Sequence, residues 1–195
     1  SCHTPAQDWI KVHNDFGGKD VKKADETAEH KAQRLAAIEA TTMIRPRDTY
    51  ELAQNCYQCH LVPNEKLVNV GGHKAGSAFE LVAYSQGGNR HNFARSANGD
   101  ENVESSIERK RMLYIVGQGL EFEHSIRGVA KATEKAKFVI TMIKRFKIAK
   151  KQLMIINAKL KLPEIQQMLD GSASAKFKLN NEAALMAAAD KVATA

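Results

Sequence analysis

The 195-residue chain has few cysteine, proline, glycine and aromatic residues. It has three cysteines, four prolines and twelve glycines, and aromatic residues make up 6% of it, with a single tryptophan. A chain of this length buries enough surface to fold without disulfide bonds, so the cysteines need another explanation. No apolar run approaches the roughly 20 residues that a membrane-spanning helix requires. Apolar residues are nevertheless 43% of the chain, which excludes disorder and predicts a soluble globular body.

Positive charge is concentrated in one part of the chain. Lys and Arg number 29 against 22 Asp and Glu, which gives a formal net charge of +7. Between Val103 and Lys161 there are 14 basic and 5 acidic residues. Such a segment can steer an acidic protein, a nucleic acid or an anionic membrane surface, although a solvated Lys-rich helix face is the simpler interpretation. No motif resembles a DNA reader, so we expect no nucleic-acid partner.

Two of the three cysteines belong to the sequence Cys56-Tyr57-Gln58-Cys59-His60. This C-x-x-C-H spacing is the attachment signature of haem c. The two thiols add to the vinyl groups on one edge of the macrocycle, and the histidine that follows becomes the proximal ligand of the iron. The motif therefore predicts one covalent haem c, held by Cys56 and Cys59 with His60 as the proximal iron ligand.

Other interpretations of the motif have less support. A redox-active C-x-x-C is expected between a strand and a helix, and the sequence around residues 50–60 predicts no strand. A zinc site needs a second pair of ligands at metal-binding spacing, which the sequence lacks. A local disulfide bond would leave His60 without a role.

On these residues the segment resembles a c-type cytochrome. The resemblance implies export, because such proteins receive their haem outside the cytoplasmic membrane, and we expect a periplasmic, extracellular or cell-surface location. The chain begins at Ser1-Cys2 without methionine, from which we expect that an export signal was removed. A small residue before a near-terminal cysteine also resembles the end of a bacterial lipoprotein signal, although Ser1 is retained here. Cys2 is then either a lipid-bearing membrane tether or an idle thiol.

The second axial ligand of the iron decides between functions. The candidates are His3, His13, His30, His73, His91 and His124, with Met43, Met112, Met142, Met154, Met168 and Met186. His73 lies in the glycine-rich loop 70–77, where the backbone can approach a flat cofactor closely. His91 follows a second Gly-Gly pair, and Tyr84 precedes it by seven residues. Between them we expect a short helix from Ser77, as its N-cap, to residue 86.

This arrangement resembles the distal-ligand segment of bis-histidine cytochromes of the c-554 type and related multihaem proteins, over about residues 50 to 95. It departs from them in carrying one attachment motif rather than several. We expect His91 or His73 to be the distal ligand. His124 stands among carboxylates on an expected helix, so we expect it to be exposed. Met112, Met142, Met154 and Met168 fall on helical patterns and are expected in the core.

The remaining sequence predicts a mainly α fold, in which a helical bundle scaffold carries a loop-rich segment with covalently bound haem c. We expect helices over residues 21–43, 163–169 (ended by Asp170-Gly171) and 181–192. Residues 103–162 form one long helical pattern that must contain a break, since a single helix of that length would measure about 90 Å, but the sequence does not mark the position. Two apolar stripes run through this pattern: Ile115, Gly119, Phe122, Ile126, Val129, Thr133, Ala136, Ile140 and Ile143, and Val139, Met142, Phe146, Ala149, Leu153, Ile156 and Leu160. Gly117 and Gly119 are expected to admit a partner helix.

These patterns divide the chain into residues 1–49, an N-terminal segment with one helix; 50–102, the haem c-binding segment; and 103–195, a basic helical scaffold. The resemblance implies a monohaem electron carrier rather than an enzyme, with acidic redox partner proteins or a larger electron-transfer complex; a homo-oligomer is left open. The alternative is a gas-binding or sensing protein with five-coordinate iron, which resembles the cytochromes c′. Their motif lies near the C-terminus of the last helix, whereas 135 residues follow it here. A haem peroxidase would need a distal acid or base and usually a second haem, and the sequence indicates neither.

Overall fold

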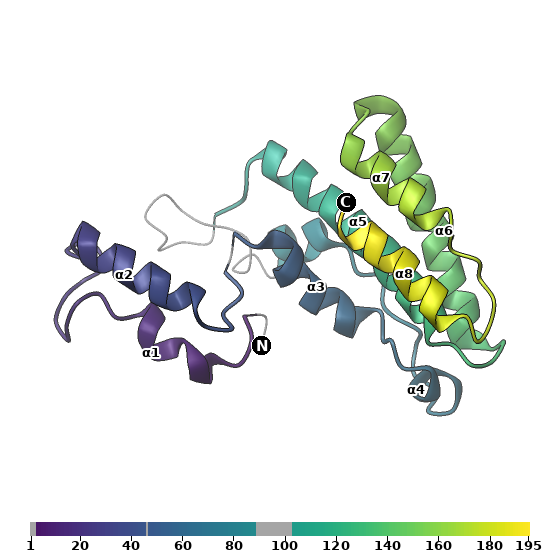
Figure 1. Ribbon diagram of the computed structural model, residues 1–195, viewed down its shortest axis with the longest axis horizontal. Coiled ribbons are helices and arrows are strands. Elements are labelled where there is room, and N and C mark those ends of the chain that lie inside the picture. Colours follow the sequence, from purple (N-terminus) through teal and green to yellow (C-terminus); the bar gives the residue numbers. More distant parts are fainter. Residues whose placement is uncertain (1–2, 46, 89–102) are drawn as a thin grey trace. The chain divides into compact units, whose positions relative to one another are not determined.

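The structure is a computed structural model that describes residues 3–45, 47–88 and 103–195 (Figure 1). This part of the chain contains eight α-helices and no strand, which confirms the predicted mainly α class. No helix among these residues combines the length and the apolar composition needed to cross a membrane. Tertiary contacts divide the chain into two compact units, Ser1–Leu52 and Ala53–Ala195.

The first unit contains the 3-10 helix η1 (Ala6–Asp8) and the helices α1 (Ile10–His13) and α2 (Ala28–Glu39). Trp9 is its largest buried side chain, and its ring packs edge-on against His13, with 5.0 Å between the ring centroids. The helix predicted over residues 21–43 is shorter than expected. It begins after Thr27, whose hydroxyl accepts a hydrogen bond from the backbone N–H of His30 at 3.2 Å.

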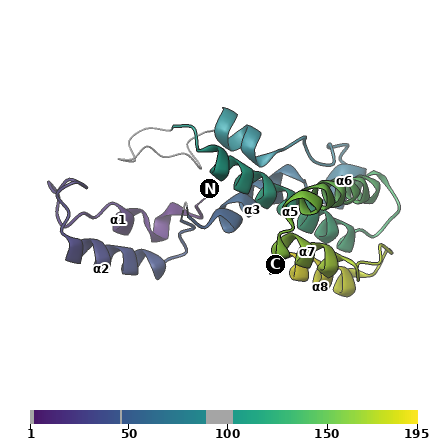
Figure 2. The same cartoon turned by 90° about the horizontal axis from the view of Figure 1, so that it is seen from above.

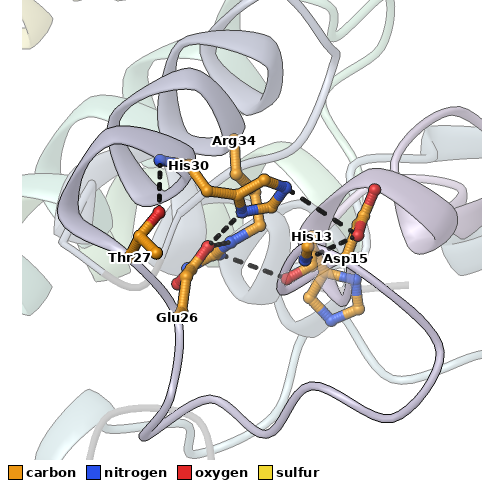
Figure 3. A network of polar contacts seen from close by, with 7 residues as sticks. His13, Asp15, Glu26, Thr27, His30 and Arg34 are labelled. Carbon is orange, nitrogen blue, oxygen red and sulfur yellow. Dashed lines mark hydrogen bonds and ion pairs between the residues drawn. The ribbon is translucent and has the colours of Figure 1, made fainter.

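A polar network holds the loop before α2 against that helix (Figure 3). Arg34 donates to the Glu26 carboxylate from Nε at 2.7 Å and from Nη2 at 2.5 Å. The Nδ1 atom of His30 lies 2.9 Å from Oε1 of the same carboxylate. The hydrogen bond from Arg34, and with it the one from His30, lowers the pKa of Glu26 to about 2. Glu26 is therefore an ionised anchor for two side chains of α2.

Four helices form the main body of the second unit: α5 (Ile107–Ala130), α6 (Lys137–Leu160), α7 (Pro163–Ser172) and α8 (Glu182–Ala193). Helix α5 packs against α6 and α8, and α7 packs against the same two helices, so the four close around one core (Figure 1, Figure 2). The core is apolar and is drawn from every one of them: Phe122, Ile126, Phe138, Met142, Leu153, Ile165, Leu185 and Ala189 are buried. This arrangement is the predicted helical bundle.

The stripe that begins at Val139 is buried as far as Leu153, as predicted. Ile156 is half-buried and Leu160 is exposed, so the prediction was wrong at the end of the stripe. The other stripe is buried from Gly119 to Val129, but Thr133 and Ile140 are exposed. The prediction of a continuous seam was wrong beyond Val129, because α5 ends at Ala130 and the chain turns there.

The break in the long helical pattern lies at residues 131–136, where the helix α4 (Glu65–Asn69) meets the turn. The Glu65 carboxylate accepts from the backbone N–H of Thr133 at 2.9 Å and of Glu134 at 3.3 Å. Asn69 Oδ1 accepts from the backbone N–H of Phe138, in the first turn of α6, at 2.9 Å. The first N–H groups of a helix lack hydrogen-bond acceptors within the helix. The N-cap residue of α6 provides no side-chain acceptor, and Asn69 of α4 provides one instead.

Two smaller predictions have different outcomes. Helix α7 continues to Ser172, past the cap expected at Asp170-Gly171. The packing role expected for the α5 glycines is confirmed. A Cβ atom at Gly117 would lie 3.0 Å from the Tyr57 hydroxyl of helix α3 (Thr49–His60), and one at Gly119 would lie 3.3 Å from Met168 of α7.

Candidate functional site

The C-x-x-C-H motif forms the last turns of α3, which remains helical through His60. Cys56, Cys59 and His60 occupy positions i, i+3 and i+4, so all three share one face of the helix. Cys59 is exposed and Cys56 is half-buried, and no disulfide bond joins them. Two thiols and an imidazole are thus presented together on one helix face.

The imidazole of His60 is held from its Nδ1 side. Nδ1 lies 3.0 Å from the Ser77 hydroxyl oxygen, and the Ser77 backbone N–H donates to the His60 carbonyl at 2.9 Å. When the hydroxyl accepts from an Nδ1–H, the imidazole carries its lone pair on Nε2, which is the form that ligates metals. The arrangement fits an iron ligand whose second nitrogen is oriented by a neighbouring group.

Aromatic side chains fix the plane of the His60 ring. Phe79 stacks on it with ring centroids 4.3 Å apart and an interplanar angle of 20°. Tyr84 meets the ring edge-on at 5.5 Å and also contacts Phe79 at 4.7 Å. These rings give His60 a low-polarity flank that suits a flat apolar macrocycle.

The loop that carries Ser77 is anchored by α6. Arg145 donates from Nη1 to the Ser77 carbonyl at 2.9 Å, and its Nη2 and Nε contact the Glu121 carboxylate of α5 at 2.9 and 2.6 Å. The guanidinium therefore joins the Ser77 carbonyl to Glu121 with one hydrogen bond to each, and its Nε lies close to the same carboxylate without hydrogen-bond geometry. Gly76 has a positive φ of +83°. A Cβ atom at this position would lie 3.1 Å from the His60 carbonyl oxygen, so the missing side chain lets the loop pass close to that group. The glycine-rich loop therefore approaches the end of α3 itself.

Tyr57, inside the motif, belongs to the core rather than to the thiol face. It is 2% exposed, and its ring packs edge-on against Phe79 at 5.0 Å. Burial, aided by the charges of Glu121 and Glu80, raises the pKa of its hydroxyl, so it stays protonated. Tyr57 thereby locks the last turns of α3 against α5.

His124 is buried, with 8% of its surface exposed, so the prediction of an exposed residue was wrong. The carboxylates beside it in sequence turn to other partners: Glu121 binds Arg145, and Glu123 binds Arg127 at 2.7 Å. His124 lines a cavity of about 420 Å³ together with Gln54 and Gln58 of α3 and with Leu61, which directly follows that helix. Those two α3 positions lie on the side of the helix opposite to Cys56 and His60, so the structure does not bring His124 to the thiol face.

Of the two distal-ligand candidates, only His73 belongs to the residues that the structure describes. His73 is an exposed residue of the loop after α4, and its Nδ1 lies 2.8 Å from the Lys74 carbonyl. His91 lies outside the described residues, as does Cys2. The other histidine candidates, His3, His13 and His30, belong to the first unit.

The expectation of four core methionines holds only in part. Met142 is fully buried, and Met168 is half-buried against the core. Met112 and Met154 are exposed, so the prediction was wrong for them. A methionine on a helix is thus buried where it falls on the apolar stripe of that helix, as Met142 does.

The helix expected from Ser77 starts later and has another cap. Residues 77–80 are not helical, and the turn that ends in the π-helix η2 (Ala83–Gly88) is capped by Glu80. The Glu80 carboxylate accepts from the backbone N–H groups of Val82 at 3.0 Å and Ala83 at 2.7 Å. The prediction that Ser77 is the N-cap of this helix was wrong, because its hydroxyl contacts His60 instead. Its partner is 17 residues earlier in the chain, and no local pattern announces that contact.

The donor set at the end of α3 is two thiols on one face with an adjacent imidazole, which is what covalent attachment of haem c requires. Within residues 3–45, 47–88 and 103–195, no three His, Cys, Asp or Glu side chains gather closely enough to hold a metal ion. The chain matches no protein-family model, no curated protein and no solved structure.

Proposed function

We propose that this protein is a monohaem c-type cytochrome that transfers electrons outside the cytoplasm. Cys56 and Cys59 hold the haem through thioether bonds, and His60 is its proximal ligand. The observation that supports this best is that the Nδ1 side of His60 is engaged by the Ser77 hydroxyl, so that Nε2 is the ring nitrogen left to bind iron when the hydroxyl accepts from Nδ1–H. Haem c supplies one-electron exchange between ferric and ferrous iron.

The surrounding residues orient and shield the proximal ligand. Ser77 orients the imidazole through its contact with Nδ1, and Arg145 holds Ser77 in place. Phe79 and Tyr84 keep water from one side of the His60 ring.

The distal ligand in this proposal is His91 or His73. Two imidazole ligands leave no open position for a substrate, which favours electron transfer over catalysis. The proposal includes a location in the periplasm or at the cell surface. A lipid tether at Cys2 and a homo-oligomer are compatible with it.

The charge of helix α6 supports the proposal of an acidic redox partner protein. It carries seven Lys and Arg residues and no Asp or Glu. In the described part of the chain, Arg145 is the α6 cation that forms an ion pair with a carboxylate. The unpaired lysines are available for electrostatic steering of an acidic protein surface.

The attachment is tested by producing the protein in a host that exports it and matures c-type cytochromes. We expect haem that stays with the polypeptide under denaturing conditions. The C56S/C59S double variant should lose it, and the matched Gln58→Ala variant, which changes a residue between the cysteines, should keep it. If the parent chain carries no covalent haem while a control cytochrome in the same host does, the proposal is wrong.

The type of function is tested by the visible spectra of the oxidised and reduced protein with and without carbon monoxide. We expect low-spin iron that does not bind carbon monoxide. Of the variants His91→Ala and His73→Ala, one should turn the iron high-spin, while His13→Ala, in the first unit, should not. A high-spin ferric spectrum with ready carbon monoxide binding in the parent protein would instead support the five-coordinate, gas-binding alternative.

A further inference from the structure

An apolar groove lies between the first half of α5 and the second half of α6. Its volume is about 680 Å³, within the range of roughly 300–1,000 Å³ that small-molecule sites occupy. Apolar side chains from both helices line it: Ile107, Tyr114, Ile115, Ile155, Ile156 and Leu160. The groove is separate from the thiol face of α3.

The groove leaves large apolar side chains in contact with water. Ile107 is 52% exposed, Ile155 44% and Leu160 55%. They lie at adjacent ends of two antiparallel helices, since the short turn at 131–136 places the start of α5 beside the end of α6. Covering these side chains would remove apolar surface from water and so favour binding.

Three cations border the same end of the groove: Lys110 and Arg111 from α5, and Lys159 from α6. Lys110 is paired with Glu104. No salt bridge joins Arg111 or Lys159 to a residue the structure describes, although hydrogen bonds from the backbone N–H of Glu108 and from Ser106, together with the charge of Arg111, lower the pKa of Glu108 on the same helix. Glu80, the carboxylate in the lining, is occupied in capping the turn at Val82 and Ala83. The groove therefore offers an apolar wall with two cations, Arg111 and Lys159, that form no salt bridge with the described residues.

We propose that this groove binds a free long-chain carboxylate, with the alkyl chain on the isoleucines and the carboxylate at Arg111 and Lys159. The lining residues 107 to 115 extend over about 12 Å of α5, which suits one extended alkyl chain. A second copy of this chain is a poorer occupant, because a protein of net charge +7 would add positive charge to a positive rim. The inference does not depend on the proposed electron-transfer function.

The test is calorimetric titration of the full chain with dodecanoate below its micelle-forming concentration. We expect saturable binding to one site. The R111E/K159E variant should weaken it by about tenfold or more, since it replaces both cations that would contact the carboxylate by carboxylates. The matched K176E/K178E variant changes the net charge equally but outside the groove, and should bind within about twofold of the parent.

Two further arms separate the groove from a general surface effect. Leu160→Ser changes an exposed side chain, so it should leave the melting temperature unchanged while weakening dodecanoate binding. Dodecanol, which lacks the charge, should bind about tenfold more weakly. The proposal is overturned by an absence of saturable binding, by equal binding of dodecanol, or by binding of anionic vesicles alone, which would assign the surface to a membrane.

Discussion

Ser77 is bonded to His60 at two points, although 17 residues separate them in the chain. Its backbone N–H donates to the His60 carbonyl at 2.9 Å, and its hydroxyl lies 3.0 Å from Nδ1 of the ring. The first bond satisfies a carbonyl at the C-terminal end of α3, and the second sets the orientation of the imidazole. One residue therefore ends the helix and positions the side chain on which the proposed function depends.

Replacing Ser77 by alanine removes the bond to Nδ1 and leaves the backbone bond. We expect the free energy of unfolding to fall by about 1 kcal/mol, measured by urea denaturation. In the haem-loaded protein the reduction potential should shift, because the proximal imidazole loses the contact that orients it. Ser77→Thr retains a hydroxyl and should stay close to the parent in both measurements. An unchanged potential in Ser77→Ala would contradict the positioning role.

Gly76 combines a left-handed backbone with close neighbours. A Cβ atom there would lie 3.0 Å from Arg145 Nη1 and 3.1 Å from the His60 carbonyl. Gly72 also has positive φ, but nothing lies within 4 Å of its Cβ position. Gly72→Ala should therefore cost only the backbone strain, roughly 1–2 kcal/mol, and Gly76→Ala clearly more. Equal losses in thermal or urea unfolding would show that the loop gives way without cost.

Glu65 stabilises the turn between α5 and α6. Burial raises its pKa, but the hydrogen bonds from Thr133 and Glu134 outweigh that effect and lower it. A carboxyl with a lowered folded-state pKa contributes stability above its unfolded-state value, near 4.5, and loses it as the pH falls through the folded-state value. Glu65→Ala should destabilise the protein by about 1–3 kcal/mol at neutral pH. Glu65→Gln, which retains one acceptor oxygen, should lose less; an equal loss would assign the effect to charge alone.

His124 should make the protein sensitive to mild acid. Burial lowers its pKa, and the charges of Arg127 and Lys131 add to this while Glu123 opposes it. The unfolded chain then binds a proton more readily than the folded one below about pH 6.5, so stability falls as the pH is lowered through that value. Its Nε2 has no hydrogen-bond partner among the residues that the structure describes, so His124→Leu loses no such bond at that atom. We expect this variant to have a flatter dependence of unfolding free energy on pH between about 5 and 7, and a dependence as steep as in the parent would refute the assignment.

The sequence predicted the buried face of a helix well where the apolar spacing was regular. It predicted the ends of helices poorly where an end depended on a single capping side chain. The stripe from Val139 to Leu153 is buried as expected. The start of α2 depends on the Thr27 hydroxyl, and the turn after residue 80 on the Glu80 carboxylate, each chosen from several residues with equal capping ability. For the candidate site, the sequence identified the thiols and the histidine, but not Phe79 or Arg145, which reach them from other segments.

By itself, the sequence determined the spacing of Cys56, Cys59 and His60. The segment was predicted to be loop-rich, and only the structure showed that it is helical and so places the three side chains on one face. The regular apolar spacing from Val139 to Leu153 did mark the side of α6 that meets the core. Only the tertiary structure decided where the long helical pattern breaks, because the N–H groups freed at that turn are bound by Glu65 and Asn69 of α4. It also decided the surroundings of His60 and the burial of His124, since each depends on side chains that come together only when the helices pack.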